Sequence, residues 1–208
     1  MSSTTMYRLS AISLLIGGGF AAIGAIAQAF LAEDYFSPLW IPVAALIFIG
    51  TIFVLIGLPA LYLRQMNRVG VFGLIGFVLL FFGFAQFGIG FRFFDIVILP
   101  WFGKNADINP PLNFIFYSLS GTFLLLVGAL MFGIATIRAC VFPKLPTFLL
   151  LVGIVLNRIG GHVPHLQDIA GILFYLSFAW FGYTLLSMLR QEVELQQSPV
   201  PTEAPIRA

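Results

Sequence analysis

Charged residues are scarce in this chain. Asp, Glu, Lys and Arg make up 9% of its 208 residues, whereas hydrophobic residues make up 60% and the mean hydropathy is +1.04. Soluble domains carry about 25% charged residues, because their surface must face water. The shortage of charge therefore excludes a soluble globular protein and predicts a protein that lies in a lipid bilayer.

Other features are missing as well. Cys140 is the single cysteine, so an internal disulfide framework is excluded. The 10 basic and 8 acidic residues are scattered and leave a net charge of +2 without a basic run, which argues against a nucleic-acid partner. Neither a GxSxG nucleophile elbow nor a glycine-rich phosphate loop occurs. The 2 histidines are too close in sequence to hold a haem from opposite sides, and we expect no catalytic residue and no cofactor.

Long apolar runs dominate the sequence instead. A bilayer core of about 30 Å is crossed by roughly 20 apolar residues in a helix. The unbroken run Leu74–Phe84 excludes the alternating pattern of a membrane barrel strand. We predict an all-α polytopic membrane bundle, with a six-span transmembrane domain at residues 1–190 and a flexible cytoplasmic tail at residues 191–208. The expected transmembrane spans are Leu9–Leu31, Leu39–Leu63, Val69–Phe91, Leu112–Ile137, Leu145–Ile159 and Leu166–Leu189.

The basic residues near the ends of these spans are unevenly distributed. One side of the predicted bundle holds Arg8, Arg64, Arg68, Arg138, Lys144 and Arg190, and the opposite loops hold Glu33, Asp34, Lys104 and Asp107. Lys and Arg are retained on the cytoplasmic side of membrane proteins. This pattern predicts that both termini are cytoplasmic and that the protein is a multi-pass protein of the inner membrane.

The two halves of the chain match in part. At one constant offset, Tyr7, Leu9, Ser10, Leu14, Leu15, Gly18 and Ala25 fall on Tyr117, Leu119, Ser120, Leu124, Leu125, Gly128 and Ala135. More loosely, Gly50 and Gly57 of the second span fall on Gly153 and Gly160 of the fifth. One interpretation is a three-plus-three duplication, whose halves would be inverted as in many transporters. The other is chance matching in a chain rich in Leu and Gly.

Ionisable and amide side chains gather at the predicted outer ends of the spans. Such residues are costly in a membrane and tend to mark function. Our candidate ligand-binding residues are Arg92, Asp95, Asn157, Arg158 and Asp168. Arg158 cannot lose its proton, so it must snorkel outward or find a carboxylate, which Asp95, Asp168, Glu33 or Asp34 could provide. Two hypotheses stay open: ion pairs that hold helix ends together, including a local Arg92–Asp95 pair, or an outward-facing pocket for an anion or a headgroup.

His162 and His165 form the one candidate metal site. They are followed by Asp168 at the same spacing of three, so two good metal ligands and a carboxylate lie close together. The alternative is that His165 and Asp168 are polar caps in the first helical turn after Pro164. The Phe residues of the third span, in contrast, are expected to meet lipid and neighbouring helices and not a cofactor.

One stretch resembles known sequences. The residues Gly57–Leu58–Pro59–Ala60–Leu61–Tyr62–Leu63–Arg64–Gln65, followed by Gly70 and Gly73–Leu74–Ile75–Gly76–Phe77, resemble a loose group of small multi-span prokaryotic membrane proteins with no assigned function. The resemblance implies a bacterial cytoplasmic membrane. It implies no activity and brings no functional residues.

Three functional hypotheses follow. The first is a small transporter or ligand-binding membrane protein with an outward-facing polar site. The second is an accessory or scaffold subunit of a larger membrane complex, and the third is a metal-dependent membrane enzyme that uses His162 and His165. The expected partners are the lipid bilayer and either further copies of the chain or another subunit of a membrane complex.

Overall fold

The structure is a computed structural model that describes residues 3–31, 37–98, 112–160, 163 and 165–197. Within these ranges the chain forms five α-helices and two π-helical segments and no strand, which confirms the all-α prediction. The elements are α1 (Ser3–Phe30), α2 (Trp40–Gly83), η1 (Phe84–Phe91), η2 (Phe94–Ile98), α4 (Leu112–Ala139), α5 (Lys144–Ile159) and α6 (Leu166–Gln197).

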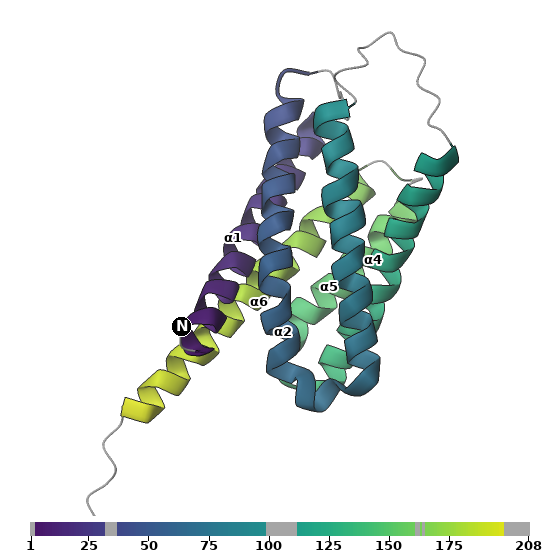
Figure 1. Cartoon of the computed structure of the whole chain (residues 1–208). Helices are drawn as coiled ribbons and strands as arrows, with labels where there is room; N and C mark the ends of the chain where they lie inside the picture. The colour runs from purple at the N-terminus through teal and green to yellow at the C-terminus, as the bar shows by residue number, and fades with distance from the viewer. Residues whose placement is uncertain (1–2, 32–36, 99–111, 161–162, 164, 198–208) are drawn as a thin grey trace, which may run out of the picture.

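Helix α2 folds back on itself at Gly70. This residue has φ +58° and ψ −162°, a conformation that only glycine adopts at low cost. The two limbs of α2, residues 40–69 and 71–83, run in opposite directions, and η1 and η2 continue the second limb (Figure 1). We call the end of the bundle that holds Gly70 the lower end. The upper end is the one at which α1 ends and α4 begins.

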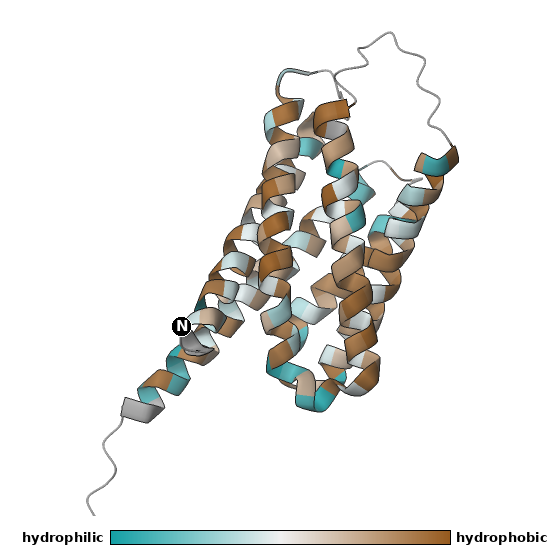
Figure 2. Cartoon of the chain, in the orientation of Figure 1, coloured by the Kyte–Doolittle hydropathy of each residue, from teal (hydrophilic) through white to brown (hydrophobic). Residues whose placement is uncertain are grey.

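Four helical segments of the described chain are long and apolar enough to cross a membrane: Thr5–Phe30, Trp40–Ile98, Leu112–Ala139 and Leu166–Glu194. Large apolar side chains face outward along them, and Val71 and Phe123 are 72% and 64% exposed. Apolar residues cover the helices along most of their length (Figure 2). Apolar surface on this scale is stable against lipid and not against water. The chain is therefore a multi-pass helical membrane protein in contact with the bilayer.

The expected spans map unevenly onto these segments. Trp40–Ile98 contains both the second and the third expected span, and α5, with 16 residues, is the shortest α-helix of the described chain. At 1.5 Å per residue α5 is about 24 Å long, slightly less than a bilayer core. Helix α6 continues to Gln197, into the segment expected to be a tail, so the flexibility of residues 191–208 stays a prediction.

The helices pack closely through small residues. Gly57 in the first limb of α2 lies against Leu14 and Ser10 of α1, where a Cβ atom would have no room. The second limb of α2 packs on α4, α6 packs on both α1 and α5, and α4 touches α5. Small residues allow this approach in membranes, where helices are held by van der Waals contact. The core between them is mainly aromatic and aliphatic, and its largest buried side chains include Phe84, Phe132, Phe178, Phe181, Leu58, Leu61 and Leu150.

Two helix crossings share one pattern. Gly18 and Leu15 of α1 abut Ala179 and Gly182 of α6, and Gly128 and Leu125 of α4 abut Leu80 and Gly83 of α2. The contacting residues of α1 and α4 are 110 positions apart in sequence, which is the offset at which the halves match, and those of α6 and α2 are 99 positions apart. Helices α1 and α4 also run in opposite directions (Figure 1). The two crossings thus have the same register in an inverted arrangement.

The match between the second and fifth spans is not reproduced in the packing. Gly50 lies against Ala21 and Gly17 of α1, whereas Gly153 lies against Phe174 and Ala170 of α6. An exact repeat would place Gly153 on α4. The similarity in packing is limited to the crossings of α1 and α4 and does not extend to the close contacts of α5.

Candidate functional site

A cavity of about 440 Å³ opens among the helices near the upper end. It forms there because α5 ends and α6 begins below the tops of α2 and η1 (Figure 1). Its polar lining residues are Gln28, Arg92, Ser118, Thr122, Asn157, Arg158, Gln167, Asp168 and Tyr175, and its aromatic ones are Trp40, Phe84, Phe87, Phe91 and Phe174. The volume lies in the range of about 300–1,000 Å³ that is typical of small-molecule sites.

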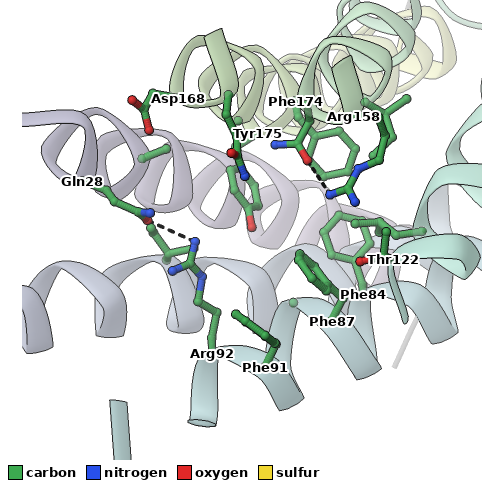
Figure 3. A pocket seen from close by; sticks show the side chains of 18 of the residues that line it. Gln28, Phe84, Phe87, Phe91, Arg92, Thr122, Arg158, Asp168, Phe174 and Tyr175 are labelled. Atoms are coloured by element: carbon green, nitrogen blue, oxygen red, sulfur yellow. Dashed lines mark hydrogen bonds between the residues drawn. The ribbon is translucent and has the colours of Figure 1, made fainter. Parts of the chain in front are cut away.

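Arg158 lies in the last turn of α5 and at the wall of this cavity. Its Nη2 donates a hydrogen bond to Oδ1 of Asn157 at 2.7 Å (Figure 3). No carboxylate of the described residues lies within ion-pair distance of its guanidinium. The ion pair expected for Arg158 is therefore not formed within the described part of the chain, and the described hydrogen bond of this cation goes to a neutral amide.

Arg92 lines the opposite part of the cavity. Its Nη2 donates to Oε1 of Gln28 in α1 at 3.1 Å (Figure 3). The side chain of Asp95 lies outside the described residues, so the Arg92–Asp95 pair stays a prediction. Asp168 is half-buried in the first turn of α6, with Oδ2 3.8 Å from Nδ1 of His165. Of the predicted polar residues, the structure thus brings Arg92, Asn157, Arg158 and Asp168 together around one cavity.

The aromatic wall corrects an expectation. Phe84, Phe87 and Phe91 do not serve only as bulk against lipid and neighbouring helices, because all three line the cavity. Phe84 is buried and stacks on Phe174 with ring centroids 5.5 Å apart, and Phe87 stacks on Phe91 at 5.3 Å. These three residues belong to η1, and π-helical turns are rare and frequent at functional sites.

Several residues that line the cavity were not predicted from the sequence. Ser118 and Thr122 of α4 are four residues apart, and Gln167 and Tyr175 lie on α6. Their polar atoms interrupt otherwise apolar spans, which is the one sequence signal that could have found them. The hydroxyl of Tyr175 lies 3.4 Å from Oγ1 of buried Thr51, so it ties α6 to α2 beside the cavity.

The predicted metal site is only partly described. His162 lies outside the described residues. His165 is exposed, has a φ of +62° and comes directly before α6. Among the described residues no group of three His, Cys, Asp or Glu side chains could hold a metal ion. The metal site formed by His162 and His165 stays a prediction.

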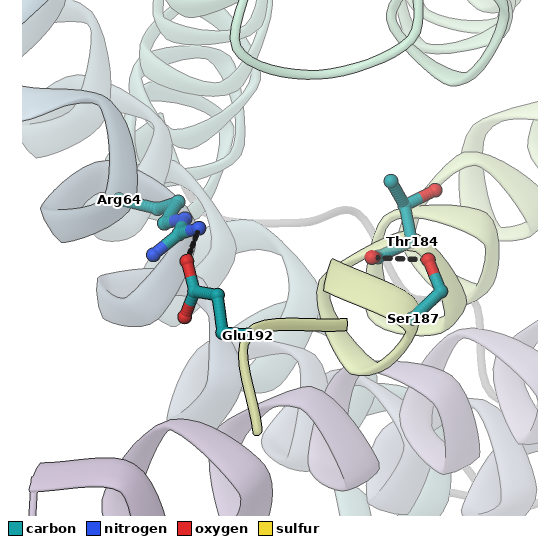
Figure 4. Close-up of polar contacts among 4 residues, drawn as sticks. All are labelled: Arg64, Thr184, Ser187 and Glu192. Atoms are coloured by element: carbon teal, nitrogen blue, oxygen red, sulfur yellow. Dashed lines mark hydrogen bonds and ion pairs between the residues drawn. The ribbon is translucent and has the colours of Figure 1, made fainter. Parts of the chain in front are cut away.

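A second hollow lies at the lower end. It is an open groove of about 460 Å³ lined by Arg64, Arg68, Cys140, Val141, Met188, Gln191 and Glu192. Arg64 of α2 donates through Nη2 to Oε1 of Glu192 of α6, and the two side chains form an ion pair (Figure 4). Their side chains are 31% and 47% exposed. The groove is thus bridged by one partly solvated ion pair.

Comparison with known proteins assigns no relative. No family model matches the chain. Searches among curated proteins and among solved structures also find no match. The function must therefore be argued from the geometry of the cavity and its surroundings.

Proposed function

We propose that this chain is a six-span protein of a prokaryotic inner membrane, and that its upper cavity is an outward-facing site of a small transporter or ligand-binding membrane protein. The observation that carries the proposal is the convergence of Arg92, Asn157, Arg158 and Asp168 on one cavity of about 440 Å³ in a chain with 9% charged residues. Costly polar groups gathered around a cavity favour a binding site over scattered structural ion pairs.

The length of the helices supports six crossings. Trp40–Ile98 has 59 residues, which at 1.5 Å per residue is about 90 Å of helix and far more than one crossing needs. Its fold-back at Gly70 supports two antiparallel crossings, and α5 provides a further, short one. The lower end carries Arg64, Arg68 and Lys144, and the rule that basic residues stay inside supports a cytoplasmic lower end.

The shared register of the two crossings supports an inverted duplication. Transporters of this kind bind their substrate at the interface between the repeats. The upper cavity takes residues from α1, α2 and η1 as well as from α4, α5 and α6, so both halves of the chain build it. No described contact favours the accessory-subunit or metal-enzyme hypothesis over this one.

Binding and stability measurements test the proposal. A broad chemical screen should identify a ligand that stabilises the purified protein in lipid nanodiscs. At 100 times its Kd such a ligand adds about 2.7 kcal/mol of stability. We expect Arg158→Leu to abolish this response. Arg138→Leu is the matched control, because Arg138 is exposed in the last turn of α4 and lines neither hollow. A folded Arg158→Leu variant with an undiminished response would rule out this site.

The native cysteine tests the orientation. Cys140 is exposed and lines the lower groove. A membrane-impermeant maleimide should leave it unlabelled in intact cells and label it after permeabilisation. Labelling in intact cells would place the lower end outside and would contradict the proposed topology.

A further inference from the structure

The described lining of the upper cavity holds the cation of Arg158, which has no carboxylate within ion-pair distance among the described residues. In Figure 3, Asp168 lies away from Arg158, and its described contact is with His165 at 3.8 Å. The described hydrogen bond of Arg158 goes to the neutral amide of Asn157. A guanidinium held in this way at the wall of a cavity can bind an anion, and its planar fork suits a carboxylate.

The apolar part of the lining is largely aromatic. Phe84 and Phe174 stack with ring centroids 5.5 Å apart, and Phe87 and Phe91 stack at 5.3 Å; Figure 3 shows the first pair on the same side of the cavity as Arg158 and the second pair on the side of Arg92. Aromatic walls favour flat, aromatic ligands, because offset and edge-to-face ring contacts add to the burial of apolar area. The aromatic wall therefore favours a flat apolar part of a ligand, and the guanidinium of Arg158 favours an anionic part.

We propose that the ligand of the upper cavity is an aromatic organic anion, whose carboxylate binds Arg158 and whose ring system lies against Phe84, Phe87 and Phe91. This inference rests on the proposed function and deepens it. A small charged ligand with no apolar part would leave the rings of Phe84, Phe87 and Phe91 without a contact. A neutral aromatic ligand would leave the guanidinium of Arg158 without an anionic partner among the described residues. The carboxylate alone could also belong to an anionic acyl chain from the bilayer, which lacks the ring system; the aliphatic anion in the test distinguishes this source.

A set of matched probes tests the proposal on the full chain in phosphatidylcholine nanodiscs by isothermal titration calorimetry. The probes are 2-naphthoate, the neutral 2-naphthamide, the cationic 2-naphthylmethylamine and the aliphatic anion decanoate. We expect 2-naphthoate to bind at least tenfold more tightly than the amide, the amine and decanoate. Arg158→Gln should weaken 2-naphthoate at least tenfold and leave the amide unchanged, whereas Arg138→Gln should change neither affinity.

Each other outcome overturns the proposal in a recognisable way. Equal affinities for the acid and the amide, or tighter binding of the amine, would show that the site does not select an anion. Decanoate binding as tightly as 2-naphthoate would remove the aromatic part and point to a lipid source. If no anion of this set binds, the proposed ligand class is wrong. The binding function itself would still stand if a ligand from the broad screen stabilised the wild type and not Arg158→Leu.

Discussion

A buried hydrogen bond between α2 and α4 gives a prediction whose sign can be worked out. Gln65 is 1% exposed, and its Nε2 donates to Oγ1 of Thr136 at 2.9 Å. The hydroxyl of Thr136 donates its own hydrogen bond to the carbonyl oxygen of Phe132 at 2.8 Å. Oε1 of Gln65 has no hydrogen-bond partner among the described residues. Rotating the amide by half a turn does not help, because the hydroxyl has no second proton to give.

Substitutions at the two ends of this hydrogen bond should change the free energy of unfolding in opposite directions. Gln65→Met removes an interhelical hydrogen bond worth about 0.6 kcal/mol in membranes, but it also removes a buried carbonyl whose missing partner costs about 1–3 kcal/mol. We expect Gln65→Met to stabilise the fold by roughly 0.5–2 kcal/mol. Thr136→Val leaves both ends of the Gln65 amide buried without a partner, and should destabilise the fold by about 1–3 kcal/mol.

The measurement is the free energy of unfolding of the purified chain in mixed micelles, obtained from an SDS titration followed by far-UV circular dichroism. The double variant Gln65→Met/Thr136→Val should lie close to the single Gln65→Met variant, because the cost of Thr136→Val exists only while the amide is present. A loss of more than 1 kcal/mol in Gln65→Met, or equal losses in both single variants, would refute the reasoning.

Two further predictions concern glycines. Gly18→Ala should destabilise the fold by about 1–3 kcal/mol in the same titration, since its Cβ would overlap the backbone of Ala179, whereas Gly19→Ala, with nothing within 4 Å, should cost nothing. Gly70→Ala and Gly70→Asn should each cost about 1–3 kcal/mol although the space around Gly70 is open, because φ +58° with ψ −162° is a conformation that only glycine adopts at low cost. Equal effects at Gly18 and Gly19, or a neutral Gly70→Ala, would contradict these contacts.

The membrane character and most helix bounds could be predicted from the sequence, because apolar runs of this length have no stable alternative to helices in lipid. The fold-back at Gly70 lies one residue inside the third expected span, close to the gap predicted between the second and third spans. The π-helical geometry of η1 was not predicted, because the apolar run Phe84–Phe91 carries no residue pattern that separates a π-helical turn from an α-helical one. The shortness of α5 was visible, but its effect, a recess below the upper end, needs the packed bundle.

The charged and amide residues of the candidate site could be predicted from the sequence, whereas its aromatic residues could not. Arg92, Asn157, Arg158 and Asp168 stand out because polar residues are rare in this chain, and all four line the cavity. The Phe residues of the third expected span, in contrast, occur on all of its faces, so nothing local separates a ring that faces lipid from one that faces a cavity. The direction of Phe87 and Phe91 depends on the π-helical turn, which rotates them relative to an α-helix.

Transport would require the lower end to open. The free energies of the contacts at that end indicate which contact keeps it closed. The Arg64–Glu192 pair is 31% and 47% exposed, so it is worth at most about 1 kcal/mol. Phe181 is fully buried and packs edge-to-face on Phe142 at 5.6 Å. Its truncation to Ala costs about 3–5 kcal/mol. The apolar layer, and not the ion pair, should therefore control opening.

Labelling of a buried cysteine at position 147 measures this opening. Thr147 is 1% exposed near the start of α5, so Cys140→Ser/Thr147→Cys should react slowly with a maleimide. In this background Glu192→Gln should raise the rate at most about fivefold, because 1.4 kcal/mol corresponds to a factor of ten in population. Phe181→Ala should raise it by tenfold or more if it still folds, and Phe181→Leu, which keeps most of the volume, should lie between the two. A larger effect of Glu192→Gln than of Phe181→Leu would assign the closure to the ion pair, since charge and not packing would then set the barrier between the closed and open lower end.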